Sequence, residues 1–418
     1  MYPREQYLKE IISKKDNGRI KIITGLRRSG KSVLLFQLYR EWLLGEGVKE
    51  DQIIALALDI LENARYRNPL ELDKYVRDHM VDPKKRYYIF IDEIQFVSEI
   101  QNPYVDNEDA KITFIDVILG FMHMDNADVY VTGSNSKMLS SDILTQFRDR
   151  GDEIRVYPLS FAEFYNEYEG DKRGAWQDYY TYGGMPLATS LESHEEKSRY
   201  LKDLFDRTYI KDVLERHEIK NDTEVLDILL DVLASGIGSL TNPSKLANTF
   251  KSERQIGIGS ETIEKYIGYF EESFLIEKAV RYDVKGRKYI GTPAKYYYTD
   301  LGLRNARLGF RQLEETHIME NVLYNDLIRR GMNVDVGVVE YNTKDADGKK
   351  IRKQLEVDFV VNQGGKRFYI QSALSIAICS PPFVIYLYCI TNYLPCQHFP
   401  NASQAHPLPP CQPKQNML

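Results

Sequence analysis

Residues 19–44 read RIKIIT-GLRRSGKS-VLLFQLYREWLL. The first six residues form a short β-branched run, which predicts a buried strand. The last twelve are apolar at helical spacing, which predicts a helix. Between them lies G-x-x-x-x-G-K-S, from Gly25 to Ser32, in the strand–loop–helix context of a phosphate-binding P-loop. The chain is therefore predicted to bind a nucleotide through this loop.

The residue types in this loop match the chemistry of a nucleoside triphosphate. Glycines let backbone N–H groups curve around the β-phosphate without Cβ clashes. Lys31 can reach the β- and γ-phosphates, and the Ser32 hydroxyl can ligate Mg²⁺. The positive end of the following helix dipole adds to this attraction. We expect ATP and Mg²⁺ as cofactors, held by Gly25, Arg28, Ser29, Gly30, Lys31 and Ser32.

A second part of the nucleotide site is predicted in residues 86–95, RYYIFIDEIQ. This apolar strand ends in two acids. Asp92 can hold Mg²⁺ through water, and Glu93 can polarise the attacking water. A kinase of small molecules would not need the second acid, so the pair favours ATP hydrolysis. The alternative is a strand that ends in two solvated acids.

A third strand is predicted at residues 128–132, DVYVT, followed by Gly-Ser-Asn-Ser. We expect this strand to lie beside the Asp-Glu strand, where a polar residue can hydrogen-bond the γ-phosphate or the attacking water. Either Ser134 or Asn135 is a candidate for this role, and we place Asn135 among the nucleotide-binding residues. A plain turn is the alternative.

Arg150 is a candidate arginine finger, which neutralises charge that develops during phosphoryl transfer. It would act on the nucleotide of its own chain or on that of a neighbouring copy. The alternative is a surface arginine paired with Asp149 or Asp152.

Five segments in fixed order, GLRRSGKS, YIFIDEIQ, VTGSNS, YPLSFAEF and YGGMPLA, resemble a large prokaryotic family of AAA-type ATPases. The resemblance covers residues 1 to about 375. It implies a parallel five-stranded sheet with helices on both faces, with Lys31 and Ser32 as the P-loop pair. It also implies Asp92 and Glu93 as the Mg²⁺ and catalytic acids. Arg150 falls where the family usually shows Gly-Arg, and Asp149 replaces that glycine here.

The α/β fold class is thus a P-loop NTPase sheet in residues 1–158, followed by further domains. Residues 159–222 are helical and tyrosine-rich, and are predicted to form a lid over the nucleotide. Residues 223–292 read as three helices and a hairpin, which resembles a winged helix. Its third helix is rich in glutamate, and its basic residues lie in the hairpin at Arg281, Lys285, Arg287 and Lys288. A structural or protein-binding winged helix is therefore as well supported as a DNA-binding one.

Residues 293–375 resemble the α+β arrangement of restriction endonucleases, with Glu320 on a helix and Asp358 on a strand. Gln371-Ser372-Ala373 stands where Glu-x-Lys is needed. A neutral amide is a poor Mg²⁺ ligand, and Ala373 has no donor, so nuclease activity is not expected. Residues 376–418 hold all four cysteines, eight of the 16 prolines and one charged residue. We expect this atypical tail to be disordered, and the preceding domain to be truncated.

The P-loop and the Asp-Glu strand together predict the function. We expect an ATPase that drives or gates a conformational change acting on an unknown partner, protein or DNA, alone or as an assembly of copies. The alternatives are a slow nucleotide-dependent binding switch and an ATP-regulated nuclease. The net charge of −6 means that any nucleic-acid contact needs a local basic patch. Residues 1–19 lack an apolar signal region, and no spanning run occurs before residue 375, so a cytoplasmic location is predicted without firm membrane association.

Overall fold

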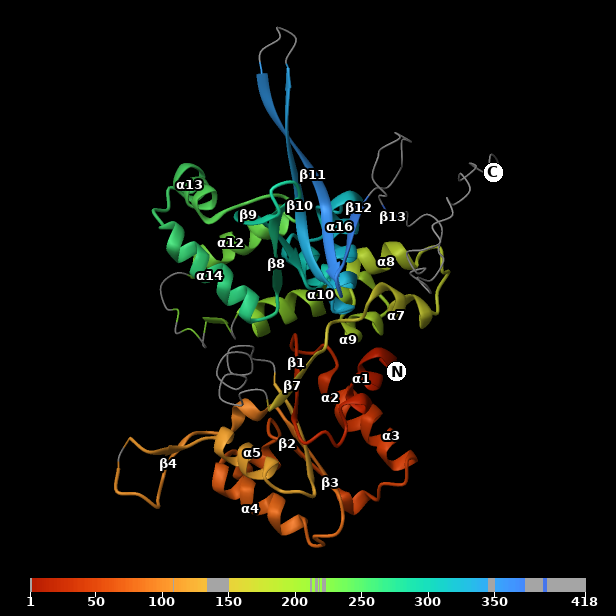
Figure 1. Cartoon of the computed structure of the whole chain (residues 1–418), viewed down its shortest axis with the longest axis vertical. Coiled ribbons are helices and arrows are strands. Elements are labelled where there is room, and N and C mark those ends of the chain that lie inside the picture. Colours follow the sequence, from red (N-terminus) through yellow and green to blue (C-terminus); the bar gives the residue numbers. More distant parts are fainter. Residues whose placement is uncertain are drawn as a thin grey trace.

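A computed structural model gives the arrangement of the chain (Figure 1). It describes residues 2–107, 109–133, 150–210, 213–214, 217, 219, 223–344, 350–372 and 386–388. The N-terminal part holds a five-stranded sheet and a small two-stranded sheet, and a six-stranded sheet lies in the C-terminal part, with helices between and around them (Figure 1).

The N-terminal sheet has five parallel strands in the order β2-β3-β6-β1-β7. The prediction of a parallel five-stranded sheet is confirmed. Every residue of the three central strands is buried, as expected for strands covered on both faces. The strands are β1 Ile20–Thr24, β2 Ile53–Ala57, β3 Tyr87–Asp92, β6 Ala127–Thr132 and β7 Gly151–Arg155.

Each face of this sheet has its own apolar core, because alternate residues of a strand point to opposite faces. Ile20 and Ile22 pack on the side of α4 (Pro69–His79) and α5 (Phe114–Met122). Ile23 packs on the other side with α1 (Glu5–Ser13) and the helix that follows the P-loop. That helix consists of α2 Lys31–Val33, the π-helical η1 Leu34–Tyr39 and α3 Arg40–Gly45. The smaller elements are η2 Glu50–Gln52, η3 Leu61–Arg67, η4 Ile94–Phe96, β4 Ile100–Gln101 and β5 Lys111–Ile112.

Helices fill the middle of the chain, as predicted. The region expected to be a lid contains α7 Phe161–Asn166, α8 Ala175–Tyr182, α9 Pro186–Thr189, α10 His194–Leu204 and η6 Phe205–Ile210. The three helices expected for a winged helix are α12 Thr223–Ser235, α13 Pro243–Glu253 and α14 Ser260–Glu272. From α9 onward, both groups share one large core with α15 (Leu301–Arg307) and pack as one helical layer, whereas the buried residues of α7 and α8 form a smaller cluster of their own.

The C-terminal sheet is mixed, with the order β13-β12-β11-β10-β8-β9, and α16 (Glu315–Arg329) packs on it. The strands are β8 Ile276–Asp283, β9 Lys288–Tyr298, β10 Asn333–Lys344, β11 Lys350–Gln363, β12 Lys366–Ser372 and β13 Tyr386–Tyr388. The predicted α+β character is confirmed. The predicted hairpin, however, belongs to this sheet because β8 pairs with β10, so the boundary expected at residue 292 falls inside β9.

Most of the predicted tail lies outside the described residues. Tyr386–Tyr388 is described, and it adds a parallel strand beside Ile370–Ser372 of β12. These three residues therefore pair with the domain that precedes them. None of the helices in the described ranges combines the length and apolar composition that a bilayer span needs.

Candidate nucleotide site

The P-loop leaves β1 at Thr24 and enters α2 at Lys31, and two of its residues require glycine. Gly25 has a φ of 129°, and an added Cβ would lie 2.1 Å from the carbonyl oxygen of Val156. Gly30 has a φ of 100° and precedes the first helical residue. Residues with a Cβ rarely adopt such angles. The loop can therefore turn its backbone inward at both of its ends.

Lys31 lies at the centre of this loop. Its side chain is only 3% exposed, and Nζ donates to the carbonyl oxygens of Gly25 at 3.0 Å and Leu26 at 3.1 Å. Burial lowers the pKa of Lys31, while the charges of Glu93 and Asp92 oppose this shift. The structure thus brings together the lysine and the two acids that the sequence predicted from separate segments.

The other predicted P-loop residues differ in their surroundings. Ser29 is fully buried, and its Oγ has no hydrogen-bond partner among the described residues. Ser32 is exposed at the start of α2, where its hydroxyl is accessible to a ligand. Arg28 is exposed with a φ of 63°, and its charge opposes the rise in the pKa of Tyr200 that burial causes. Arg28 therefore lies near α10 of the helical layer.

Asp92 and Glu93 are positioned by a residue that sequence reasoning missed. Thr132, fully buried at the end of β6, donates its hydroxyl to a carboxylate oxygen of Asp92. Its Oγ accepts from the backbone N–H of Glu93 at 3.1 Å. Glu93 has a left-handed φ of 53°, which turns the chain directly after β3. One sequence feature could have predicted this role: Thr132 is the last residue of the strand that was expected to lie beside the Asp-Glu strand.

The remaining predicted site residues are Ser134, Asn135 and Arg150. Ser134 and Asn135 lie outside the described residues, so their role stays a prediction. Arg150 is exposed and immediately precedes β7, where its carbonyl oxygen accepts from the N–H of Ile20. That is the amino end of the parallel sheet, whereas the P-loop lies at the carboxyl end, a strand length of about 16 Å away. This position gives no support to a finger that acts on the nucleotide of the same chain, and the role of Arg150 stays a prediction.

The P-loop is connected to the rest of the chain through β7 and the helical layer. Thr24 donates its hydroxyl to Glu153 of β7 at 2.7 Å, and Leu26 is buried in the core that contains α10. At the end of β7, the guanidinium of Arg155 forms an ion pair with Glu277 of β8. It also lies 4.5 Å above the ring of Phe274. A chain of contacts thus runs from the phosphate-binding loop to the C-terminal sheet.

The acids of the predicted nuclease-like site are held by side chains from the same domain. Lys295 Nζ lies 2.8 Å from Glu320 and 2.6 Å from Glu356. Gln371 donates its side-chain N–H to Asp358 at 2.7 Å. Burial raises the pKa of Asp358 to about 6, and the charge of Glu320 adds to this rise. Gln371 acts here as a donor to a carboxylate, and the described residues contain no group of three or more acids, histidines or cysteines able to hold a metal.

Comparisons with known proteins agree with this architecture. Residues 17–165 match the family described as an AAA domain, and residues 173–314 match a domain of unknown function. An uncharacterised protein of Haemophilus influenzae is 34% identical over 381 residues, which is 90% of this chain and 88% of that protein. One from Methanocaldococcus jannaschii is 28% identical over 361 residues, 82% and 72% of the two chains.

Two solved structures align with part of this chain. The Walker-type ATPase of Pyrococcus abyssi aligns with a TM-score of 0.49 at 12% identity, covering 74% of this chain and 96% of that one. The Aeropyrum pernix ORC2 protein aligns with a TM-score of 0.38 at 10% identity, covering 78% and 93%.

Proposed function

Because the chain belongs to a family of proteins that join an AAA domain to a domain of unknown function, we propose that it binds ATP with Mg²⁺ and hydrolyses it. The energy or the nucleotide state would then change the conformation of the C-terminal part, which contacts a partner. The observation that carries this proposal is the buried ammonium of Lys31, which experiences the charges of Asp92 and Glu93.

The residues present fit a triphosphate and a magnesium ion. The exposed hydroxyl of Ser32 and the carboxylate of Asp92 are oxygen ligands of the kind that Mg²⁺ prefers. Magnesium, when bound, neutralises charge on the phosphate oxygens. Lys31 adds a second positive charge at the β- and γ-phosphates. Gly25 and Gly30 allow backbone N–H groups to approach the phosphates closely.

Hydrolysis would be attack of water on the γ-phosphate, with Glu93 orienting that water. Thr132 supports this role because it fixes both the backbone of Glu93 and the side chain of Asp92. Positioning and electrostatic stabilisation supply most of the catalysis in such reactions. The local geometry of these three residues is therefore expected to matter more than any single contact.

The link from β1 through β7 to β8 supports a mechanical output. A shift of the P-loop on nucleotide binding would reach Glu153 through Thr24, and the Arg155–Glu277 pair would pass it to the C-terminal sheet. The same link serves the second candidate, in which ATP holds one conformation and turnover is slow. The two candidates share the site and differ only in rate.

Steady-state ATP hydrolysis with Mg²⁺ tests the proposal. Glu93→Gln is expected to lower turnover at least about 100-fold, in the range for loss of a general base, while ATP binding persists. Lys31→Ala is expected to lose both binding and turnover. Glu46→Gln, which changes an exposed carboxylate at the C-terminal end of α3, is the matched control and should behave as wild type. Wild-type turnover no higher than that of Glu93→Gln, with ATP still bound, would overturn hydrolysis and leave the slow switch.

A further inference from the structure

The two longest strands of the chain extend beyond the sheet to which they belong. β8 pairs with β10 over Val336–Val338, whereas the pairing of β10 with β11 continues to Lys344 and Lys350. The result is a two-stranded arm, residues 341–344 with 350–353, which projects from the top of the molecule (Figure 1). An isolated two-stranded ribbon is marginally stable in water and buries little apolar surface. The length of the arm is therefore better explained by an external contact than by folding.

The arm is basic in a chain that is acidic overall. Residues 341–355 contain five basic and two acidic side chains, whereas the chain carries a net charge of −6. Lys350 and Lys353 are exposed, and the pairing register places them on opposite faces of the arm. Neither forms an ion pair with any residue that the structure describes. Both faces of the arm thus present positive charge to solvent.

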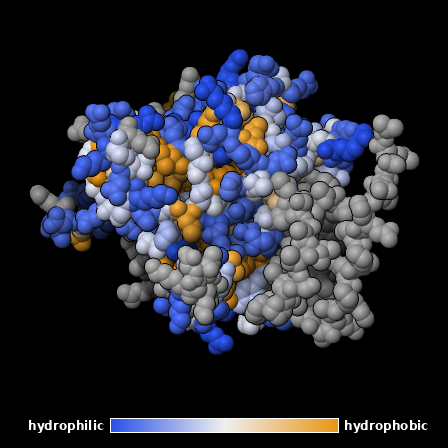
Figure 2. All heavy atoms as spheres, turned by 90° about the horizontal axis from the view of Figure 1, so that it is seen from above, coloured by the Kyte–Doolittle hydropathy of each residue, from blue (hydrophilic) through white to orange (hydrophobic). Residues whose placement is uncertain are grey.

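A second basic hairpin lies at the root of the arm. The backbone N–H of Val284, at the β8–β9 turn, donates to the carbonyl oxygen of Val338 of β10 at 2.9 Å. Because β8 and β10 are parallel, this turn points in the same direction as the arm. Its basic side chains are all exposed, and within the described ranges they too form no ion pair; they are Lys285, Arg287 and Lys288. Figure 2, viewed along the arm, shows mostly hydrophilic side chains on this end of the molecule.

The charge pattern matches phosphates on two sides better than a flat protein surface. A protein that covered one face of the arm would bury a lysine and would leave the other face unused. The walls of a nucleic-acid groove carry phosphates on both sides. The major groove of B-form DNA, about 12 Å wide and about 8.5 Å deep, admits a two-stranded ribbon. The free part of the arm is about 13 Å long at roughly 3.3 Å per residue, which is enough to enter that groove.

We propose that the β10–β11 arm and the β8–β9 turn together bind double-stranded B-form DNA. The arm lies in the major groove, and the turn contacts the adjacent phosphates. Contacts with phosphates position a protein but do not read sequence, so binding is largely independent of sequence. The proposal identifies DNA as the partner of the proposed ATPase, and this identification rests on the proposed function. The binding of DNA itself needs no ATP.

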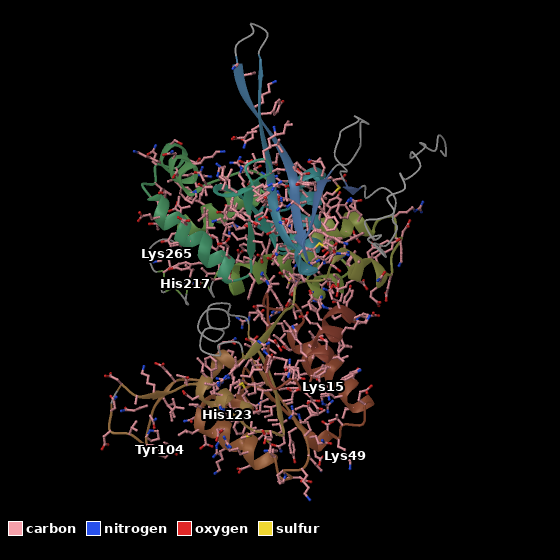
Figure 3. The ribbon with its side chains drawn as sticks, viewed as in Figure 1. Lys15, Lys49, Tyr104, His123, His217 and Lys265 are labelled. Carbon is pink, nitrogen blue, oxygen red and sulfur yellow. The ribbon has the colours of Figure 1, made fainter. Side chains whose placement is uncertain are left out.

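The helix expected to read DNA in a winged helix is not part of this surface. α14 carries four glutamates and one lysine, and Lys265 lies on the side of the molecule, well away from the arm (Figure 3). Lys265 Nζ is 5.7 Å from the centre of the Tyr269 ring on the same helix. The basic surface is therefore formed by hairpins of the C-terminal sheet.

The test uses the full chain and a fluorescein-labelled 24-base-pair DNA duplex, with anisotropy read between 50 and 200 mM salt and without ATP. Lys350→Gln/Lys353→Gln removes the two arm charges, and Lys285→Gln/Arg287→Gln removes two at the turn. Lys49→Gln/Lys84→Gln is the matched control, because it removes two exposed lysines from the ATPase core; Lys49 lies at the opposite end of the molecule (Figure 3). Thermal unfolding of each variant confirms that its fold is retained.

Each phosphate contact contributes a slope of about −0.9 in log K against log salt concentration. We expect each basic-surface variant to bind at least about tenfold more weakly at 100 mM salt, with a slope shallower by nearly 2 for two lost contacts. The control should match wild type. An A-form RNA duplex of the same sequence should bind more weakly, because its major groove is too narrow for the arm.

Three results would overturn the proposal: no salt-dependent binding by wild type, equal affinity of the arm variant and the control, or equal affinity for the RNA duplex. The hydrolysis assay separates the two proposals. DNA binding that persists in a chain without turnover would refute the proposed ATPase function alone, whereas turnover without DNA binding would refute this inference alone.

Discussion

Gly25→Ala tests whether the P-loop needs glycine for space or only for its backbone angles. A Cβ at Gly25 would lie 2.1 Å from the carbonyl oxygen of Val156, at a φ of 129°. Gly30 is a natural comparison because its φ is 100°, yet its Cβ would meet only Pro186 Cγ at 4.0 Å. The two positions share the backbone strain and differ in the steric overlap.

The expected magnitudes follow from this difference. A residue with a Cβ in a sparsely populated backbone region costs about 1–3 kcal/mol, which is the whole effect expected of Gly30→Ala without nucleotide. At Gly25, Val156 must in addition move by about 1.3 Å to restore an ordinary contact. We expect a total of about 4–5 kcal/mol, as large as single substitutions reach. At about 2–4 °C per kcal/mol, Gly25→Ala should melt about 8–20 °C below wild type, and Gly30→Ala about 2–12 °C below it.

Thermal unfolding without nucleotide, followed by circular dichroism, measures these shifts. Gly45→Ala is the control, because its added Cβ would meet nothing within 4 Å. That variant should melt at or slightly above the wild-type temperature. A melting temperature of Gly25→Ala equal to or above that of Gly30→Ala would refute the reasoning, since the contact with Val156 would then be without cost.

Three further predictions concern charges. Asp128→Ala leaves the fully buried Lys21 without its ion-pair partner and should lower the free energy of unfolding, measured in urea, by about 3–5 kcal/mol. Lys21→Met should lower it by less, because Tyr130 still donates a hydrogen bond to Asp128. A larger loss of stability in Lys21→Met than in Asp128→Ala would contradict this reasoning. Burial raises the pKa of Asp300 to about 6, so the folded state holds this proton more tightly and stability falls as pH rises from about 4 to 6. Asp300→Asn should flatten that fall in urea midpoints at pH 4.5 and 6.5, and an unchanged slope would disprove the assignment. If Arg150 acts on a neighbouring copy, turnover per chain should rise with protein concentration in wild type but not in Arg150→Ala; turnover that is independent of concentration in both would remove this role.

The P-loop and the central strands were predictable because their signals are local. A β-branched run followed by a glycine-rich loop specifies a strand and a turn without knowledge of the rest of the chain. The buried environment of Lys31 also follows, since the loop carbonyl oxygens that it contacts belong to neighbouring residues. Asp92 and Glu93 were predicted to belong to the nucleotide site, and they lie at the carboxyl end of β3, on the same edge of the sheet as the P-loop after β1.

Features that depend on long-range pairing were not predictable. The role of Thr132 depends on the register between β6 and β3, which pairs Val131 with Ile91, and the residues of β6 alone do not specify that register. The assignment of Arg150 was based on its order in the sequence. In a parallel sheet the residue before a strand lies at the opposite edge from the residue after it, and Arg150 precedes β7.

The arm was missed for a different reason. Residues 350–355 read KIRKQL. Because both faces of the arm are exposed to solvent, its polar and apolar residues do not alternate between an exposed face and a buried one. Periodicity identifies strands only where one face is buried. Membership of the β8–β9 hairpin in the C-terminal sheet was also hidden, because it depends on pairing with β10, more than 50 residues later.

The position of β1 inside its sheet has a consequence for synthesis of the chain. β1 pairs with β6 and β7, and the pairing of Ile20 with Gly151 spans roughly 130 residues. At about 5–20 residues per second, a ribosome needs roughly 7–26 s to make that interval. Until then at least one edge of an apolar strand stays unpaired, which exposes the nascent chain to aggregation and to chaperone binding. β1 is made early and is thus among the last strands of the sheet to complete its native pairing, and a nucleotide bound at the P-loop would stabilise only chains in which that pairing is complete.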